Sequence, residues 1–260
     1  MKNAFNGNGL RREIGLFSAT VLVIANMMGT GIFTTSGFIL AEVRDPRALL
    51  FCWVCGGLFA LCGALCYGEL GARFPKAGGE YVFLKESFGK PVGFLSGWIS
   101  LIVGFSAPIA AASIAFATYA FQAFQIPTGD ATVLRFMGTP LVTLSPLNLV
   151  AIGAIGVFTA IHYHSLRVGS RVQNLLTLFK VALVVGFIGA GFYFGHGTFH
   201  HLQSPAIVPS AIGAEKIAIS LIFVSFAYSG WNAAAYLGSE ITNPRRNIPY
   251  ALFIGTAVVA

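Results

Sequence analysis

The first apolar segment of the chain is interrupted near its midpoint by two glycines, Gly29 and Gly31. Apolar sequence runs over residues 14–23 and resumes over 32–40, which together give a helix enough length to cross a bilayer. Glycine inside a helix costs about 1 kcal/mol relative to alanine, so the pair favours local unwinding. Lipid offers no partners to the N–H and C=O groups that unwinding frees, so these groups must face protein, water or a ligand.

Two interpretations of this break are open when the stretch is taken by itself. Discontinuous helices build the substrate sites of secondary transporters near the middle of the membrane, where the N-terminus of a half-helix faces an anionic group of the substrate. Small residues such as glycine also let two membrane helices pack closely without any ligand. A second break elsewhere in the chain would favour the first interpretation.

Composition indicates a membrane protein. Hydrophobic residues make up 56% of the chain and charged residues only 10%, whereas about a quarter of the residues of soluble domains are charged. The formal net charge of +7 could suggest a nucleic acid partner, but the basic residues are scattered between apolar segments and form no patch. We therefore expect an all-α polytopic protein surrounded by the lipid bilayer, with no nucleic acid partner.

The apolar segments predict where the chain crosses the membrane, since a transmembrane helix needs about 20 residues. A single transmembrane domain is expected over residues 1–260, with a kink at Pro108 in its third span. The spans are placed near 15–41, 47–72, 92–124, 146–164, 173–195 and 214–240, and a seventh begins near 249. Because the sequence stops about ten residues into this seventh segment, too few to cross a bilayer, we expect the N-terminal portion of a longer protein.

Basic residues predict the orientation of the chain. Eleven of those in the N-terminus and loops fall on one side and four on the other, and cytoplasmic loops carry the excess of positive charge. The N-terminus is therefore expected in the cytoplasm, with the protein in the cell's inner membrane. The eleven are Lys2, Arg11, Arg12, Arg73, Lys76, Lys85, Lys90, Arg167, Arg171, Arg245 and Arg246.

Cysteines and histidines do not fall in a pattern typical of metal sites. The four cysteines share one apolar segment, where we expect them to pack as small apolar side chains. Three histidines fall in the outer loop between the fifth and sixth spans, without a further ligand nearby, and are expected to be solvated. These residues are Cys52, Cys55, Cys62, Cys66, His196, His200 and His201. With no triad spacing and no P-loop either, we expect no metal, no cofactor and no enzyme.

A second helix breaker, Ser229-Gly230, lies near the middle of the sixth apolar segment. Two interrupted spans at corresponding positions of two halves are the best sequence indication of a transporter's binding site. Breaks in the first and sixth segments fit a five-plus-five inverted repeat whose second half this sequence only begins. The ligand-site interpretation of Gly29 and Gly31 therefore gains over simple packing.

A set of motifs resembles those of the amino acid–polyamine–organocation permeases, especially the L-type amino acid transporter branch. Residues 29–33, Gly-Thr-Gly-Ile-Phe, resemble the family's Gly-Ser-Gly-Ile-Phe signature, and residues 226–231, Phe-Ala-Tyr-Ser-Gly-Trp, look like its sixth-helix signature. Further matches, in the same order, lie at 67–70, 74–81, 172–174 leading to Lys180, and 243–249. The resemblance covers nearly the whole chain, and the main departure is length, because the family has roughly twice as many spans.

The resemblance implies an amino acid substrate and assigns its contacts. The carboxylate is expected on backbone N–H groups at the start of a half-helix, and the ammonium group on carbonyls of the unwound turns. The ring of Phe226 is expected to shield the substrate from the outside, the alternative being a packing or lipid-facing ring. The substrate-binding residues so assigned are Met27, Gly29, Thr30, Gly31, Phe226, Ala227, Ser229 and Gly230.

Lys180 is a cation inside an apolar span. Charges at that depth are costly and usually functional. The resemblance implies that this lysine points between the first and eighth helices, where a sodium ion sits in sodium-coupled relatives, as a coupling or structural cation. The alternative is that its long side chain extends to the nearby membrane interface.

Together these features predict a secondary active transporter, a permease or exchanger that moves amino acids by alternating access, with protons as a candidate coupling ion. A second hypothesis is a non-transporting membrane receptor or scaffold that derives from a permease. Both place the amino acid between the broken first and sixth segments.

Overall fold

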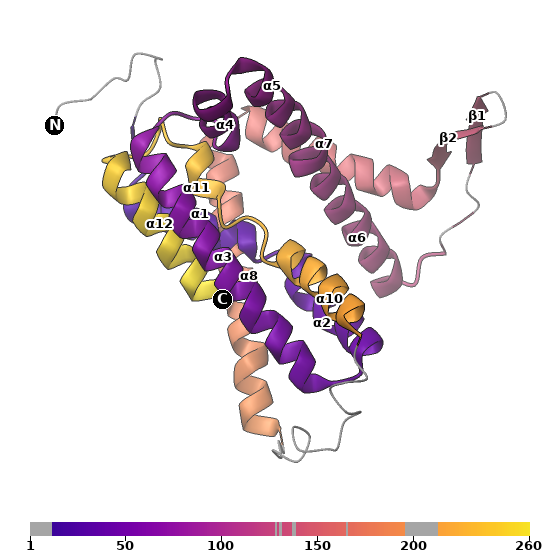
Figure 1. The fold of residues 1–260 in the computed structure, drawn as a ribbon. Helices are drawn as coiled ribbons and strands as arrows, with labels where there is room; N and C mark the ends of the chain where they lie inside the picture. The colour runs from indigo at the N-terminus through magenta and orange to yellow at the C-terminus, as the bar shows by residue number, and fades with distance from the viewer. Residues whose placement is uncertain (1–11, 128, 130–131, 137–138, 165, 196–212) are drawn as a thin grey trace. The chain divides into compact units, whose positions relative to one another are not determined.

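The computed structural model describes residues 12–260 except 128, 130–131, 137–138, 165 and 196–212. The three histidines of the predicted outer loop lie outside the described residues. The chain divides into two units, one formed by residues up to Ser96 together with those from Phe187 onwards, and the other by Gly97–Gly186. Each is described by itself (Figure 1).

The first segment is broken where the two glycines predict it. Helix α1 (Leu16–Met27) ends just before Met28, and α2 (Thr30–Val43) begins after Gly29. Gly29 is extended, with φ −99° and ψ −171°, so any residue could adopt this backbone conformation. What glycine contributes here is the absence of a side chain, and with it the low helix propensity that ends α1.

Helix α3 (Pro46–Arg73) follows without interruption. Asp45 begins it as an N-cap whose carboxylate accepts a hydrogen bond from the backbone N–H of Arg47 at 2.8 Å. One face of α3 carries glycines that bring neighbouring segments very close: a β-carbon on Gly56 would lie 2.3 Å from Val224, and one on Gly71 would lie 2.7 Å from Ile248. Small residues at helix interfaces are typical of membrane proteins, because they let backbones approach.

The sixth segment is broken as well. Helix α10 (Ala214–Ala227) ends in an irregular turn over 228–232, and α11 (Ala233–Tyr236) adds one short turn of helix. Helix α10 packs against α2 and α3, where the rings of Phe38 and Phe223 stack at 6.3 Å. The two breaks predicted from sequence are therefore both present.

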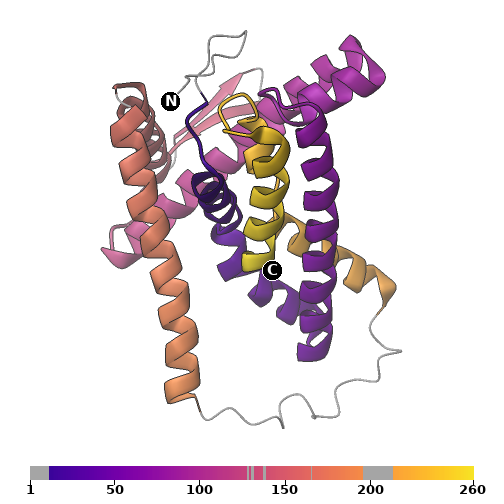
Figure 2. The ribbon, with the colours of Figure 1, turned by 90° about the vertical axis from the view of Figure 1, so that its left-hand side faces the viewer.

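Helix α12 (Pro244–Val259) packs along α1 and α3 (the yellow helix in Figures 1 and 2). A β-carbon on Gly255 would lie 2.7 Å from Val23. At one end of this unit, α4 (Glu80–Phe88) and α5 (Lys90–Ile99) follow a loop that pairs with the end of α11 through an isolated bridge between Ala77 and Leu237.

The second unit begins at Gly97, near the end of α5, and continues with π-helix η1 (Ser100–Ser106), which runs directly into α6 (Ala107–Ala123). The backbone N–H of Ala107 bonds to the carbonyl of Ile102, five residues back. Pro108 has no N–H to donate, so the irregularity predicted at this proline takes the form of a π-helical stretch on its N-terminal side.

A β-hairpin, which the sequence analysis did not predict, follows α6. Strands β1 (Thr132–Phe136) and β2 (Thr139–Leu144) pair antiparallel, with Thr132 opposite Leu144. Helices α7 (Pro146–His164) and α8 (Leu166–Phe194) complete the described elements, and α8 runs into the first unit at its C-terminal end.

Among the described residues, four helical stretches are long and apolar enough to cross a membrane: Leu16–Val43, taken across its break, Pro46–Arg73, Lys90–Ala123 and Leu175–Phe194. Pro146–Ile161 is apolar but shorter. Many large apolar side chains point outward, as Phe51, Val54 and Leu58 do on α3, which suits a surface that meets lipid. The chain is a multi-pass membrane protein, as its composition predicts.

Candidate functional site

The two helix breaks contact each other through their backbones. A β-carbon on Gly31 would lie 2.8 Å from Cα of Ala227, and one on Gly230 would lie 2.7 Å from the carbonyl carbon of Asn26. Residues about 200 positions apart in the sequence thus lie in backbone contact. Sequence reasoning predicted the two breaks but left their contact to the resemblance.

The first break presents backbone donors. N–H groups in the first turn of any helix lack an intrahelical partner, and no side chain of the described residues caps α2. Aligned peptide dipoles make this end of a helix positive, which favours an anion there. Apart from its chain neighbours, no atom of the described residues lies within 4 Å of where a β-carbon on Gly29 would be. Gly29 and Thr30 are exposed, so these donors border open space.

The second break presents backbone acceptors. Gly230 has φ +103°, a conformation that glycine adopts without the steric penalty of a β-carbon. The N–H of Ser229 bonds to the carbonyl of Phe226 at 3.0 Å, and across the first break the N–H of Gly29 bonds to the carbonyl of Met27 at 2.8 Å. A carbonyl oxygen has two lone pairs, so the oxygen of Met27 can accept a second hydrogen bond.

Side chains at the site differ in exposure. The side chain of Met27 is fully buried, so its backbone carbonyl is the only group that it can offer a ligand. The ring of Phe226 is 64% exposed, and Ser229 is also exposed. Ala227 is buried and fills the space beside Gly31. The smallness of Gly31 therefore serves close packing against the sixth segment.

Aromatic rings of α3 support the second break. Tyr228 packs edge-on against Trp53 at 5.3 Å, and Tyr67 packs edge-on against Trp231 at 4.9 Å. The indole of Trp231 also covers Gly63, where a β-carbon would lie 2.8 Å from Cη2 of the ring. Tyr67 and Trp231 belong to motifs that the sequence singled out, but their pairing had no sequence signal.

Glu80, the first residue of α4, contacts the segment that follows the second break. Its carboxylate accepts a hydrogen bond from the side-chain amide of Asn232, the residue just before α11. Lys76 pairs with Glu86, at 3.3 Å.

Lys180 lies within the apolar part of α8, with its side chain half-buried. It belongs to the second unit, whereas the two breaks belong to the first. Its predicted contact with the first helix therefore stays a prediction.

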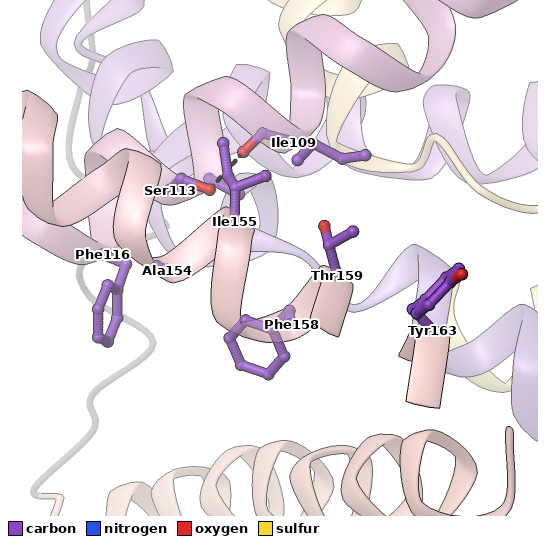
Figure 3. Close-up of a pocket in the computed structure, with 9 residues that line it drawn as sticks. Ile109, Ser113, Phe116, Ala154, Ile155, Phe158, Thr159 and Tyr163 are labelled. Carbon is purple, nitrogen blue, oxygen red and sulfur yellow. Dashed lines mark hydrogen bonds between the residues drawn. The ribbon is translucent and has the colours of Figure 1, made fainter. Parts of the chain in front are cut away.

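The second unit contains a large apolar groove of about 710 Å³ between α6 and α7 (Figure 3). Side chains such as Ile109, Phe116 and Phe158 line it. Its serine, Ser113, donates a hydrogen bond to the carbonyl of Ile109 at 2.8 Å, the dashed line in Figure 3. None of the predicted substrate-binding residues lines the groove, and its chemistry does not suit a charged amino acid head group.

Comparisons with known proteins show which family the chain belongs to. Residues 14–260 match the family model described as amino acid permease. The chain is 34% identical to the b(0,+)-type amino acid transporter 1 of Mus musculus over 96% of this chain and 49% of that protein.

Two further relatives are similar to the same extent. The chain is 32% identical to the large neutral amino acids transporter small subunit 2 of Homo sapiens, over 97% of this chain and 46% of that protein. It is also 32% identical to the serine/threonine exchanger SteT of Bacillus subtilis (strain 168), over 97% of this chain and 53% of that protein. The chain thus spans about half the length of the curated relatives that it matches.

Proposed function

The chain belongs to the amino acid permease family, and from this membership we propose that the protein is a secondary active transporter, a permease or exchanger that moves amino acids across a membrane by alternating access. The names of its relatives support transport, since they are amino acid transporters and an exchanger. The observation that carries the proposal is the contact between the two helix breaks.

Backbone groups at these breaks suit the two charges of an amino acid. The carboxylate binds at the N-terminus of α2, on N–H groups around Thr30 and Gly31, where the helix dipole favours an anion. The ammonium group binds carbonyl oxygens of the unwound turns, at Met27, Phe226, Ala227 and Ser229. These contacts involve only the part that all amino acids share, so they set the class of substrate and not its side chain.

The exposed ring of Phe226 stands beside these carbonyls. We propose that it closes over a bound amino acid and excludes water, since a dry site strengthens hydrogen bonds to charged groups. Gly29 and Gly230 keep the two turns open, the first by lacking a side chain and the second by its positive φ.

The breaks in the first and sixth segments support a five-plus-five inverted repeat, in which one bundle moves against the other around the site. In this arrangement the protein lies in the cell membrane with its N-terminus in the cytoplasm, as the loop charges indicate. Lys180 acts as the coupling or structural cation that links the site to the moving scaffold, and protons are the candidate coupling ion.

Competition among head-group analogues tests the proposal. Binding of a labelled amino acid to the purified protein is measured against the unlabelled amino acid, its amide, which lacks the carboxylate, and its N-acetyl derivative, which lacks the ammonium group. We expect only the intact amino acid to compete. Competition by either blocked analogue at equal concentration would contradict the two-charge site. Binding without any uptake into cells that express the protein would favour the receptor hypothesis.

A further inference from the structure

Glu80 connects the start of α4 to the short helix α11, which follows the second break. It is the first residue of α4, and its carboxylate accepts a hydrogen bond from Asn232, the residue just before α11. Tyr236, at the end of α11, hydrogen-bonds to the same carboxylate. The side chain of Glu80 thus contacts residues at both ends of α11.

The position of Glu80 is costly for a carboxylate. Its second oxygen, Oε2, is buried and has no hydrogen-bond partner in the part of the chain that the structure describes. The basic residue nearest in sequence, Lys76, pairs with Glu86 instead. A buried carboxylate oxygen without a hydrogen bond costs free energy, so this second oxygen does not add to stability.

Helix α11 cannot hold its own place by helical hydrogen bonds. It has only four residues, and so short a helix is unstable alone because nucleation is unfavourable. Backbone bonds from the loop before α4 support its end: the N–H of Gly78 donates to the carbonyl of Tyr236 at 3.1 Å, and that of Ala77 donates to the hydroxyl of Ser239 at 2.9 Å. At the start of α11, the side-chain amide of Asn232 donates a hydrogen bond to the carboxylate of Glu80.

Asn232 follows directly on the turn that forms the site. It lies two residues after Gly230, which is pressed against the backbone of Asn26. Because so little chain separates Asn232 from Gly230, a hydrogen bond that restrains Asn232 also restrains the orientation of the carbonyls at Ser229 and Gly230.

We propose that Glu80 is a positioning residue, which sets the geometry of the second break through Asn232 and so controls amino acid affinity without touching the substrate. This inference rests on the proposed function for its effect on binding, but not for its effect on the turn itself. The hydrogen bond itself positions the turn. An exchange of donor and acceptor between positions 80 and 232 should therefore preserve the geometry of the second break.

Four variants test this: Glu80→Ala, Asn232→Asp, the exchanged pair Glu80→Gln with Asn232→Asp, and Glu86→Gln. The last removes a carboxylate of the same helix that makes a surface ion pair, and serves as the matched control. Loss of a hydrogen bond to a charged group should weaken amino acid binding by about tenfold in Glu80→Ala and Asn232→Asp. The exchanged pair should bind within about threefold of the parent protein, and the control should be unchanged.

A second measurement reports the turn without any amino acid. A cysteine at Ser229, in a protein whose four native cysteines are replaced, is labelled with a thiol reagent. We expect Glu80→Ala to change the labelling rate by about tenfold and the exchanged pair to restore it. Unchanged labelling in Glu80→Ala, or no recovery in the exchanged pair, would overturn the inference. Absence of amino acid binding in the parent, with labelling as expected, would count against the proposed function alone.

Discussion

The carbonyl carbon of Asn26 lies 2.7 Å from the position that a β-carbon on Gly230 would occupy, and its oxygen lies 2.8 Å away. The first and sixth segments therefore meet backbone to backbone at their breaks, with no room for a side chain between them. Because the proposed site is made of main-chain groups, its chemistry depends on how closely these two segments approach rather than on which side chains they carry.

Replacement of Gly230 by alanine should disrupt the site. The new β-carbon would clash with rigid backbone atoms of Asn26, and a φ of +103° disfavours any other residue by about 1–2 kcal/mol. We expect amino acid binding to weaken by more than about tenfold while the protein still inserts into the membrane. Gly37→Ala is the control, since its added carbon meets no described atom within 4 Å apart from its chain neighbours and the backbone of its own helix. Equal binding by Gly230→Ala and the control would show that the breaks do not form the site.

Substitutions at Gly29 and Gly31 should differ in their effects, because the first should weaken only amino acid binding and the second should also lower the stability of the protein. Gly29 is extended and borders open space, so Gly29→Ala should leave the free energy of unfolding unchanged or raise it by about 0.5 kcal/mol. If that space holds the substrate carboxylate, the same change should weaken binding by about tenfold. Gly31→Leu should lower the melting temperature and abolish binding, because Ala227 fills its space. Thermal melting and labelled amino acid binding distinguish the two, and full binding by Gly29→Ala would place the carboxylate elsewhere.

Labelling from outside the cell should confirm the orientation. Glu42 and Lys76 both have exposed side chains, and they lie on opposite sides of the predicted topology. In a protein without its native cysteines, Glu42→Cys should react with an impermeant thiol reagent in intact cells, and Lys76→Cys should react only after permeabilisation. Glu42 pairs with Lys216 at the surface, and the loss of such a pair costs little. The reverse pattern would invert the topology.

Lys180→Ala should slow transport more than it weakens binding. A cation inside an apolar span is expected to serve the motion of the transporter. We expect the maximal uptake rate to fall by at least about tenfold, with the amino acid dissociation constant nearly unchanged. Leu178→Ala is the control, because Leu178 lies on the same helix with a largely exposed apolar side chain. Equal uptake rates for both variants would mean that Lys180 only extends to the membrane interface.

Sequence chemistry predicted the breaks well because they depend on local backbone preference. Glycine weakens a helix wherever it stands, so Gly29 and Gly230 mark their own turns. The close contact of Gly31 with Ala227 could not be predicted in this way, because it depends on how α2 and α10 pack against each other. A glycine that loosens a helix and a glycine that admits a neighbour look alike in sequence.

Two other features could not be predicted for related reasons. The hairpin of β1 and β2 lies between spans, in a stretch whose apolar content suggested nothing more than a connection. Glu80 follows Lys76 by four residues in the sequence, which favours an ion pair between them. In the folded chain Lys76 instead pairs with Glu86, and Glu80 accepts a hydrogen bond from Asn232. The partners of a charged side chain depend on distances in the folded chain, and these cannot be predicted from neighbouring positions in the sequence.

The contact of Gly63 with the indole of Trp231 has a consequence for how these proteins diverge. The ring occupies the space that a side chain at position 63 would need, so a change at either position affects packing at the other. An alanine or serine at 63 meets the outer edge of the indole, which must then shift or give way to a smaller side chain. Among related sequences, tryptophan at position 231 should therefore occur mostly together with glycine at position 63.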